Sequence, residues 1–235
     1  MSSDAFINYH QEIERTFVVL GKNAEKIQSI LKSQSTIKTK NGTEYHLSKI
    51  KKATAVHFFS KSNQSNIKLR LKFILKNDKI KVRYSPKIEL GEHVFEGRWL
   101  KDISLDKAFF KIQGFGPIVS SFVKRKIKHK YLSKNARSIN VCIDNVIGFD
   151  PCSVNYFGSS FYHLEIEAEH TDDLQEFCDC HFFCEQIRPC VRPILEDDTK
   201  WVQASTYCRQ NAYLNYDSVA EMRKYIVSIK QIVLS

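Results

Sequence analysis

One short stretch of the chain alternates apolar and basic residues almost without a break. It reads NIKLRLKFILKNDKIKVRY over residues 66–84, with a polar turn at residues 76–78 between its two halves. Side chains that alternate in this way point to opposite faces of a strand, so the stretch is predicted to be a β-hairpin with one apolar and one cationic face. The cationic face carries Lys68, Arg70, Lys72, Lys79, Lys81 and Arg83.

Further stretches show the same alternation with charges of one sign on one face. Residues 122–132 form a third basic strand, and residues 10–19 and 162–170 form two acidic strands. Their aligned charges are Glu12, Glu14, Lys124, Lys126, Lys128, Lys130, Glu165, Glu167 and Glu169. Residues 138–148 alternate Val141 and Ile143 with polar residues that include Asp144.

The separation of the two signs suggests how these strands are arranged. A solvated face usually mixes its charges, whereas rows of like charge repel unless something between them compensates. A closed or nearly closed antiparallel β-barrel with the charged faces turned inward meets this need. Glutamates on adjacent strands would bind a hard divalent cation such as Mg²⁺ or Mn²⁺, and the facing lysines and arginines would hold the oxygens of a polyphosphate.

The apolar faces of the same strands then require helices outside the barrel. Residues 23–34, 104–114, 171–187 and 217–232 have helical spacing of their apolar positions, with Asn23 and Ser104 as caps and Pro189 after the third helix. The fold class predicted is therefore α+β, a tunnel with helices packed outside. Residues 1–210 are expected to form the tunnel domain, with residues 211–235 as a C-terminal helix packed on it.

Composition indicates the charge of the partner and the cellular compartment of the protein. The 235 residues carry 36 Lys and Arg against 26 Asp and Glu, a net charge of +10, which favours an anionic partner. The hydrophobic content of 43% excludes a disordered chain. No stretch of about 18 apolar residues and no secretory signal is found, so we expect a cytoplasmic protein with no membrane partner.

Seven cysteines, an odd number, favour reduced thiols over a disulfide framework. Four of them gather with His181 in the stretch EFCDCHFFCEQIRPC, as Cys178, Cys180, Cys184 and Cys190. The spacing does not reproduce paired C-x-x-C zinc knuckles, so core packing of reduced thiols is the favoured interpretation and zinc binding the alternative.

Five motifs in order, EIERTF, KLRLKF, GFGPIVSSFVKRK, CIDNVIGF and LEIE, resemble those of the CYTH-domain proteins, the triphosphate tunnel metalloenzymes. The resemblance spans roughly residues 11–207 and implies Mg²⁺ or Mn²⁺ as cofactor. It implies metal ligands at Glu12, Glu14, Asp144, Glu165 and Glu167, and catalytic roles for Glu12, Glu14 and Lys124. It implies substrate-binding roles for Arg70, Lys72, Lys81, Arg83, Arg98, Lys124 and Lys126, and a match at Tyr207.

The chain also departs from the family pattern. Thr16 stands where the opening motif usually has a lysine, Lys126 stands where an arginine is usual, and the stretch VFEGRWLKD lacks a clear R-x-E. A lysine holds phosphate as a point charge, whereas arginine offers a bidentate fork. The departures are compatible with an enzyme of altered specificity or with a domain that binds without turnover.

The function expected is metal-dependent hydrolysis of a triphosphate, either inorganic tripolyphosphate or one carried by thiamine or a nucleoside. Three alternatives remain open: a class IV adenylate cyclase that makes cyclic AMP from ATP, an RNA 5′-triphosphatase, and a catalytically weak polyphosphate- or nucleotide-binding module. The expected partner is a small triphosphate-bearing molecule or an RNA 5′ end. The sequence leaves open whether the protein is a monomer or a homodimer.

Overall fold

A computed structural model describes residues 7–60, 67–76, 79–90, 93–99, 118–150 and 155–195. Several features predicted from the sequence lie outside these ranges. They are the helices at residues 104–114 and 217–232, most of the hairpin turn, Tyr207, and the C-terminal segment 211–235.

Within the described residues, the strands form one antiparallel sheet of twelve. The strands are β1 Ile7–Gln11, β2 Ile13–Val19, β3 Thr36–Lys38, β4 Glu44–Ser60, β5 Ile67–Lys76, β6 Lys79–Tyr84, β7 Lys87–Leu90, β8 His93–Trp99, β9 Ile118–Ser133, β10 Ser138–Asp150, β11 Asn155–Ala168 and β12 Val191–Pro193. Their order is β1-β8-β7-β5-β4-β9-β10-β11-β2-β12, with β6 paired to β5 and β3 paired to β4. The alternating stretches predicted as strands are confirmed as β2, β5, β6, β9, β10 and β11.

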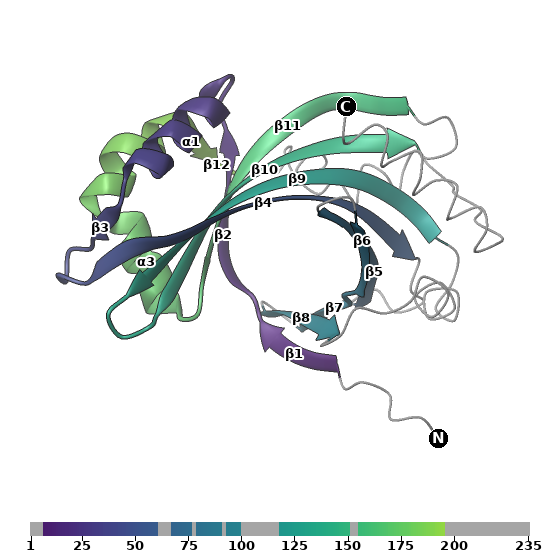
Figure 1. The fold of residues 1–235 in the computed structure, drawn as a ribbon, viewed down its shortest axis with the longest axis horizontal. Helices are drawn as coiled ribbons and strands as arrows, with labels where there is room; N and C mark the ends of the chain where they lie inside the picture. The colour runs from purple at the N-terminus through teal and green to yellow at the C-terminus, as the bar shows by residue number, and fades with distance from the viewer. Residues whose placement is uncertain are drawn as a thin grey trace.

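The sheet curls until its first strand comes near its last ones (Figure 1). The stretch predicted as one acidic strand is two, because the chain bends at Glu12 between β1 and β2. After the bend, the backbone N–H of Glu12 donates to the carbonyl of Val94 in β8 at 2.8 Å. No ladder joins β1 to β2 among the described strands. The predicted closed or nearly closed barrel is therefore confirmed as a curled antiparallel sheet, whereas hydrogen bonds among the described strands do not close it into a complete barrel.

Two helices lie at one end of the strands, to the left of the ring in Figure 1. Helix α1 spans Asn23–Ser33 and α3 spans Thr171–Asp179. Their buried side chains, such as Leu31 and Phe177, share a core with Val141 of β10 and Ile166 of β11. These two strand residues alternate with polar ones, so the apolar face of the sheet packs against the helices while the other face stays charged.

The third predicted helix is shorter than expected. Residue 180 is extended, and the chain continues as a π-helical turn, η1 Phe183–Ile187, and a 3₁₀ turn, η2 Arg188–Cys190. The single helix predicted for residues 171–187 is therefore wrong. The predicted cap is also corrected, because Asn23 is the first residue of α1 and Lys22 precedes it without a side-chain cap.

The cysteines described in the structure are free thiols. Cys178, Cys180 and Cys190 are buried in the core next to the helices, as predicted for reduced thiols. His181 is exposed, and no close group of metal-ligating residues in the described ranges includes a cysteine. Separately, none of the described helices has the length and apolar character needed to cross a membrane.

Candidate functional site

The charged faces of the strands meet in one cavity of about 330 Å³. Seven strands contribute to its charged lining, which contains both signs. The acids are Glu12, Glu14, Glu96, Glu165 and Glu167, and the cations are Arg70, Lys72, Arg83, Lys87, Lys124, Lys126 and Lys128. Residues from both ends of the described chain thus surround a single space.

Most of the site residues suggested by the sequence lie in this lining. They are Glu12, Glu14, Arg70, Lys72, Arg83, Lys124, Lys126, Glu165 and Glu167. Asp144 lies behind the wall with no exposed surface. Lys81 is exposed on β6 opposite Ile74 and is not among the lining residues. Arg98 is on β8 opposite Asn8, and its side chain lies outside what the structure describes.

Lysines of β9 pair with acids of β11 across the intervening strand β10. Lys124 Nζ lies 2.8 Å from Glu165 Oε1, and Lys126 Nζ lies 2.8 Å from Glu165 Oε2. Lys126 and Lys128 approach the two oxygens of Glu167 at 3.2 and 2.7 Å. Burial alone would raise the pKa of Glu167, but Lys126 and Lys128 lower it to about 2. The wall is thus a ladder of alternating charges.

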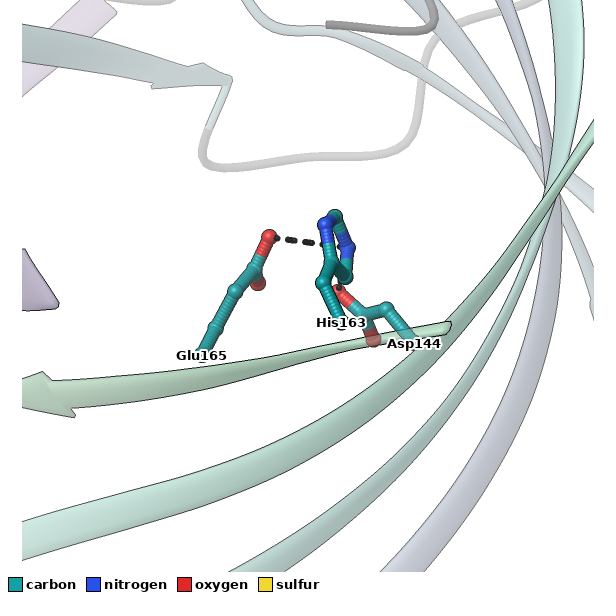
Figure 2. Close-up of side chains that lie close together, drawn as sticks. All are labelled: Asp144, His163 and Glu165. Carbon is teal, nitrogen blue, oxygen red and sulfur yellow. Dashed lines mark ion pairs between the residues drawn. The ribbon is translucent and has the colours of Figure 1, made fainter. Parts of the chain in front are cut away.

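Asp144 of β10 is buried behind this row of charges and contacts two of its lysines. Its carboxylate pairs with Lys124 and lies 3.4 Å from Lys126 Nζ. Figure 2 shows His163 between the carboxylates of Asp144 and Glu165, with Nε2 at 3.3 and 3.4 Å from them. The ligand atoms of these three buried residues lie within 4.8 Å of one another, a spacing that a metal ion could use. Lys124 and Lys126 also pair with the carboxylates of Asp144 and Glu165, so a cation at this spacing would compete with two lysines.

A second cluster of charges centres on Glu96 of β8. Its Oε1 accepts hydrogen bonds from Arg70 at 2.5 Å and from Lys72 at 2.7 Å, and Ser85 also donates to it. Burial opposes ionisation, but Lys72 and Arg70 lower the pKa of Glu96 well below its usual value. Burial, followed by the charge of Arg70, lowers the pKa of Lys72 to about 7.

A lysine from another strand stands beside the opening acidic motif. Lys87 of β7 places its Nζ 2.5 Å from Glu12 Oε2, and both residues line the cavity. Thr16, at the motif position where a lysine was expected, pairs with Glu165 along the β2–β11 ladder and does not line the cavity. Lys87 therefore places a positive charge beside Glu12, although Thr16 occupies the motif position where a lysine was expected.

Glu14 differs from the other acids of the cavity. It is the most exposed of them, and within the described residues it forms no ion pair with a lysine or arginine. It lies directly opposite Glu167 on the β2–β11 ladder. Burial, the charge of Glu165 and then that of Glu12 raise the pKa of Glu14 to about 7. Burial and a hydrogen bond to Glu96 also raise the pKa of Glu12. This corner of the cavity thus has excess negative charge.

No protein-family model and no curated protein matches the sequence. The chain is similar to solved structures, including the PH1012 protein of Pyrococcus horikoshii OT3, which is 20% identical with a TM-score of 0.43 over 78% of this chain and 96% of its own. The inorganic triphosphatase NE1496 is 10% identical, with a TM-score of 0.34 over 88% and 97% of the two chains. The RNA triphosphatase Pct1 of S. pombe, in complex with the Spt5 CTD, is 10% identical, with a TM-score of 0.36 over 97% and 86%.

Two of these three proteins are named as triphosphatases. Identities and TM-scores this low assign no role to any residue of this chain. The function is therefore inferred from the chain's own side chains.

Proposed function

We propose that the protein hydrolyses a triphosphate inside this cavity with the help of a divalent cation. One observation carries the proposal: acids of β2 and β11 and cations of β5 and β9 line the same space of about 330 Å³. A triphosphate bears several negative charges and is carried as a complex with Mg²⁺ or Mn²⁺, so it needs both kinds of wall.

The acids near Glu14 fit a hard divalent cation. Glu14 has no lysine or arginine partner among the described residues, and burial, followed by the charges of Glu165 and Glu12, raises its pKa. Carboxylate oxygens are the ligands that Mg²⁺ and Mn²⁺ prefer. We assign Glu12, Glu14 and Glu165 as the residues that would hold the cation, with Glu167 beside them. Asp144 instead anchors Lys124 and Lys126.

Binding in this cavity requires an exchange of partners. Lys124 and Lys126 are paired with Glu165, and Lys87 with Glu12. An incoming triphosphate would attract these lysines and leave the carboxylates without compensation, a state that is costly when the groups are buried. A divalent cation that arrives with the triphosphate balances the carboxylates. The two ligands are therefore expected to bind better together than alone.

The chain's own cations then serve the reaction. A bound divalent cation supplies charge that polarises the phosphoryl group. Lys124 and Lys126 from β9, with Arg70 and Lys72 from β5, hold the phosphate oxygens and stabilise the charge that develops during transfer. Phosphoryl transfer depends mainly on such positioning and electrostatics, so no further nucleophilic side chain is required. Lys87 supplies the cation that Thr16 does not, which favours turnover over binding alone.

The test measures phosphate release from tripolyphosphate and from ATP, with Mg²⁺ or Mn²⁺ or with EDTA. The variant is Glu14→Gln, and the matched control is Glu44→Gln, which removes a glutamate of β4 far along the sheet from the cavity lining. Release that depends on the cation and falls at least about a hundredfold only in Glu14→Gln supports the proposal. Equal release from all three proteins, or none from the wild type, would refute it.

A further inference from the structure

Among the described residues that line the cavity, those of one strand carry no charge, and Lys51 lies on the same face of that strand outside the lining. Strand β4 lies between β5 and β9 in the sheet, and it lines the cavity with Ala53, Ala55 and His57. Its neighbours carry cations at the facing positions. Ala53 and Ala55 lie opposite Lys126 and Lys124 of β9, and His57 lies opposite Lys72 of β5.

The flanking cations turn away from this strand. Lys124 and Lys126 reach towards Asp144 and Glu165, on β10 and β11. On the other side, Arg70 and Lys72 reach towards Glu96 of β8. The two groups of cations therefore point away from each other. Between them lies the floor of the cavity, the surface of β4 formed by Ala53, Ala55 and His57. Figure 1 shows β4 running between β9 and the strands β5 and β6 along the ring.

Besides these cations, two uncharged residues adjoin the floor. Ile74 lies opposite Ala55 on β5 and lines the cavity, as does Tyr84 of β6. His57 is 4% exposed, and burial together with the charges of Arg70, Lys72 and Lys124 keeps its pKa well below the usual value. A neutral imidazole carries one donor and one acceptor nitrogen. The floor thus combines apolar contact with a neutral hydrogen-bonding group at one end.

Such a surface suits a different part of the substrate from the phosphates. Methyl groups cannot replace the hydration of a phosphate oxygen, whereas they pack well against a flat organic group. We propose that Ala53, Ala55 and His57 are specificity-determining residues that hold the nucleoside of a nucleoside triphosphate, while neighbouring cations of the cavity hold its phosphate chain. The inference rests on the proposed function and adds the residues that distinguish an esterified triphosphate from a free one.

The test compares two non-hydrolysable probes by calorimetry in Mg²⁺: β,γ-methylene ATP and a methylene-bridged analogue of tripolyphosphate. Ala55→Leu fills the floor and is expected to weaken the ATP analogue at least about tenfold, and the tripolyphosphate analogue less than about threefold. Thr54→Leu, which changes the next residue of the same strand outside the lining, is the matched control and is expected to change neither.

Two further variants separate hydrogen bonding from folding. His57→Leu is expected to weaken the ATP analogue about fivefold to tenfold, and His57→Gln, which keeps a donor and an acceptor, to restore binding within about threefold. If Ala55→Leu weakens both probes equally, the floor holds phosphates and the inference is wrong, although the proposed function stands. If Ala55→Leu weakens neither, the inference is also wrong. If the wild type binds neither probe, the proposed function itself fails.

Discussion

Glu96 of β8 and Arg70 of β5 form a 2.5 Å ion pair inside the cavity, and both are nearly inaccessible to solvent. The same carboxylate oxygen holds Lys72 at 2.7 Å. One buried carboxylate thus balances the buried Arg70 and the half-buried Lys72, and its removal would leave both without compensation. The pairing also fixes the direction in which these cations point, away from β4 and towards β8.

Replacing Glu96 should therefore destabilise the fold. We expect Glu96→Gln to lower the free energy of unfolding by about 3 kcal/mol, since breaking a buried pair leaves an uncompensated charge. Urea denaturation measures the change. Glu167→Gln is the matched control: Glu167 also accepts from two lysines but is half-buried, so a loss of about 1 kcal/mol is expected. Equal losses in the two variants would contradict this view of Glu96.

The pH dependence of ligand binding should report Lys72. Burial and Arg70 lower the pKa of Lys72 to about 7, so its positive charge disappears between pH 6 and pH 8. Arginine keeps its charge throughout this range. We expect the affinity of wild type for tripolyphosphate, relative to that of Lys72→Arg, to fall by up to about tenfold from pH 6 to pH 8. Isothermal titration at each pH measures the ratio, and parallel curves for the two proteins would refute the prediction.

Glu14 should make the metal-free protein less stable at high pH. The pKa of Glu14 is raised to about 7 in the folded protein from the ordinary value of 4.5, so the folded state binds the proton more tightly than the unfolded state does. Its stabilising proton is fully present below pH 4.5 and is lost as the pH rises through 7. Because Glu14 is partly exposed, the effect is discounted to about 1 kcal/mol.

In EDTA, wild type should lose about 1 kcal/mol of stability relative to Glu14→Gln between pH 5 and pH 8, as followed by urea denaturation. Glu25→Gln removes an exposed carboxylate of α1 and serves as the control. A difference between wild type and Glu14→Gln that does not change with pH would argue against excess negative charge at this corner.

Triphosphate and divalent cation should strengthen each other's binding. Lys87 pairs with Glu12, and Lys124 and Lys126 pair with Glu165, so each ligand alone breaks pairs that both ligands together replace. We expect the dissociation constant of the methylene-bridged tripolyphosphate analogue to fall at least about tenfold when saturating Mg²⁺ replaces EDTA. Linkage requires the same factor for the effect of the analogue on Mg²⁺ affinity. Independent binding of the two ligands would contradict the exchange of partners.

The strands with strict alternation were predictable from the sequence because a period of two determines which side chains share a face. That reasoning brought Glu12, Glu14, Glu165 and Glu167 together, and the structure places all four at one cavity. Strand β4 was missed although it is the longest described strand. Lysines interrupt its alternation near a register shift at residues 47–49, and two of its three cavity positions are alanines, which carry no charge signal.

Other site residues could not be predicted because their partners lie on strands that are distant in the sequence. Lys87 and Glu96 lie opposite each other on β7 and β8, yet neither belongs to a row of like charges. Glu96 is an isolated acid in the sequence of β8, and its partners Arg70 and Lys72 are identified only by the fold. The bend at Glu12 was likewise hidden, because β1 and β2 continue one alternating pattern although they pair with different strands.

The central claim is that one cavity holds a triphosphate and a divalent cation between acids of β2 and β11 and cations of β5 and β9. Crystals grown with Mn²⁺ and the methylene-bridged tripolyphosphate analogue test it directly through the anomalous scattering of manganese. The account predicts manganese bound to Glu14 with Glu12 or Glu165, and phosphate oxygens within hydrogen-bond distance of Lys124 and Lys126. Manganese and the analogue bound outside the cavity, or an empty cavity at saturating concentrations of both, would contradict it.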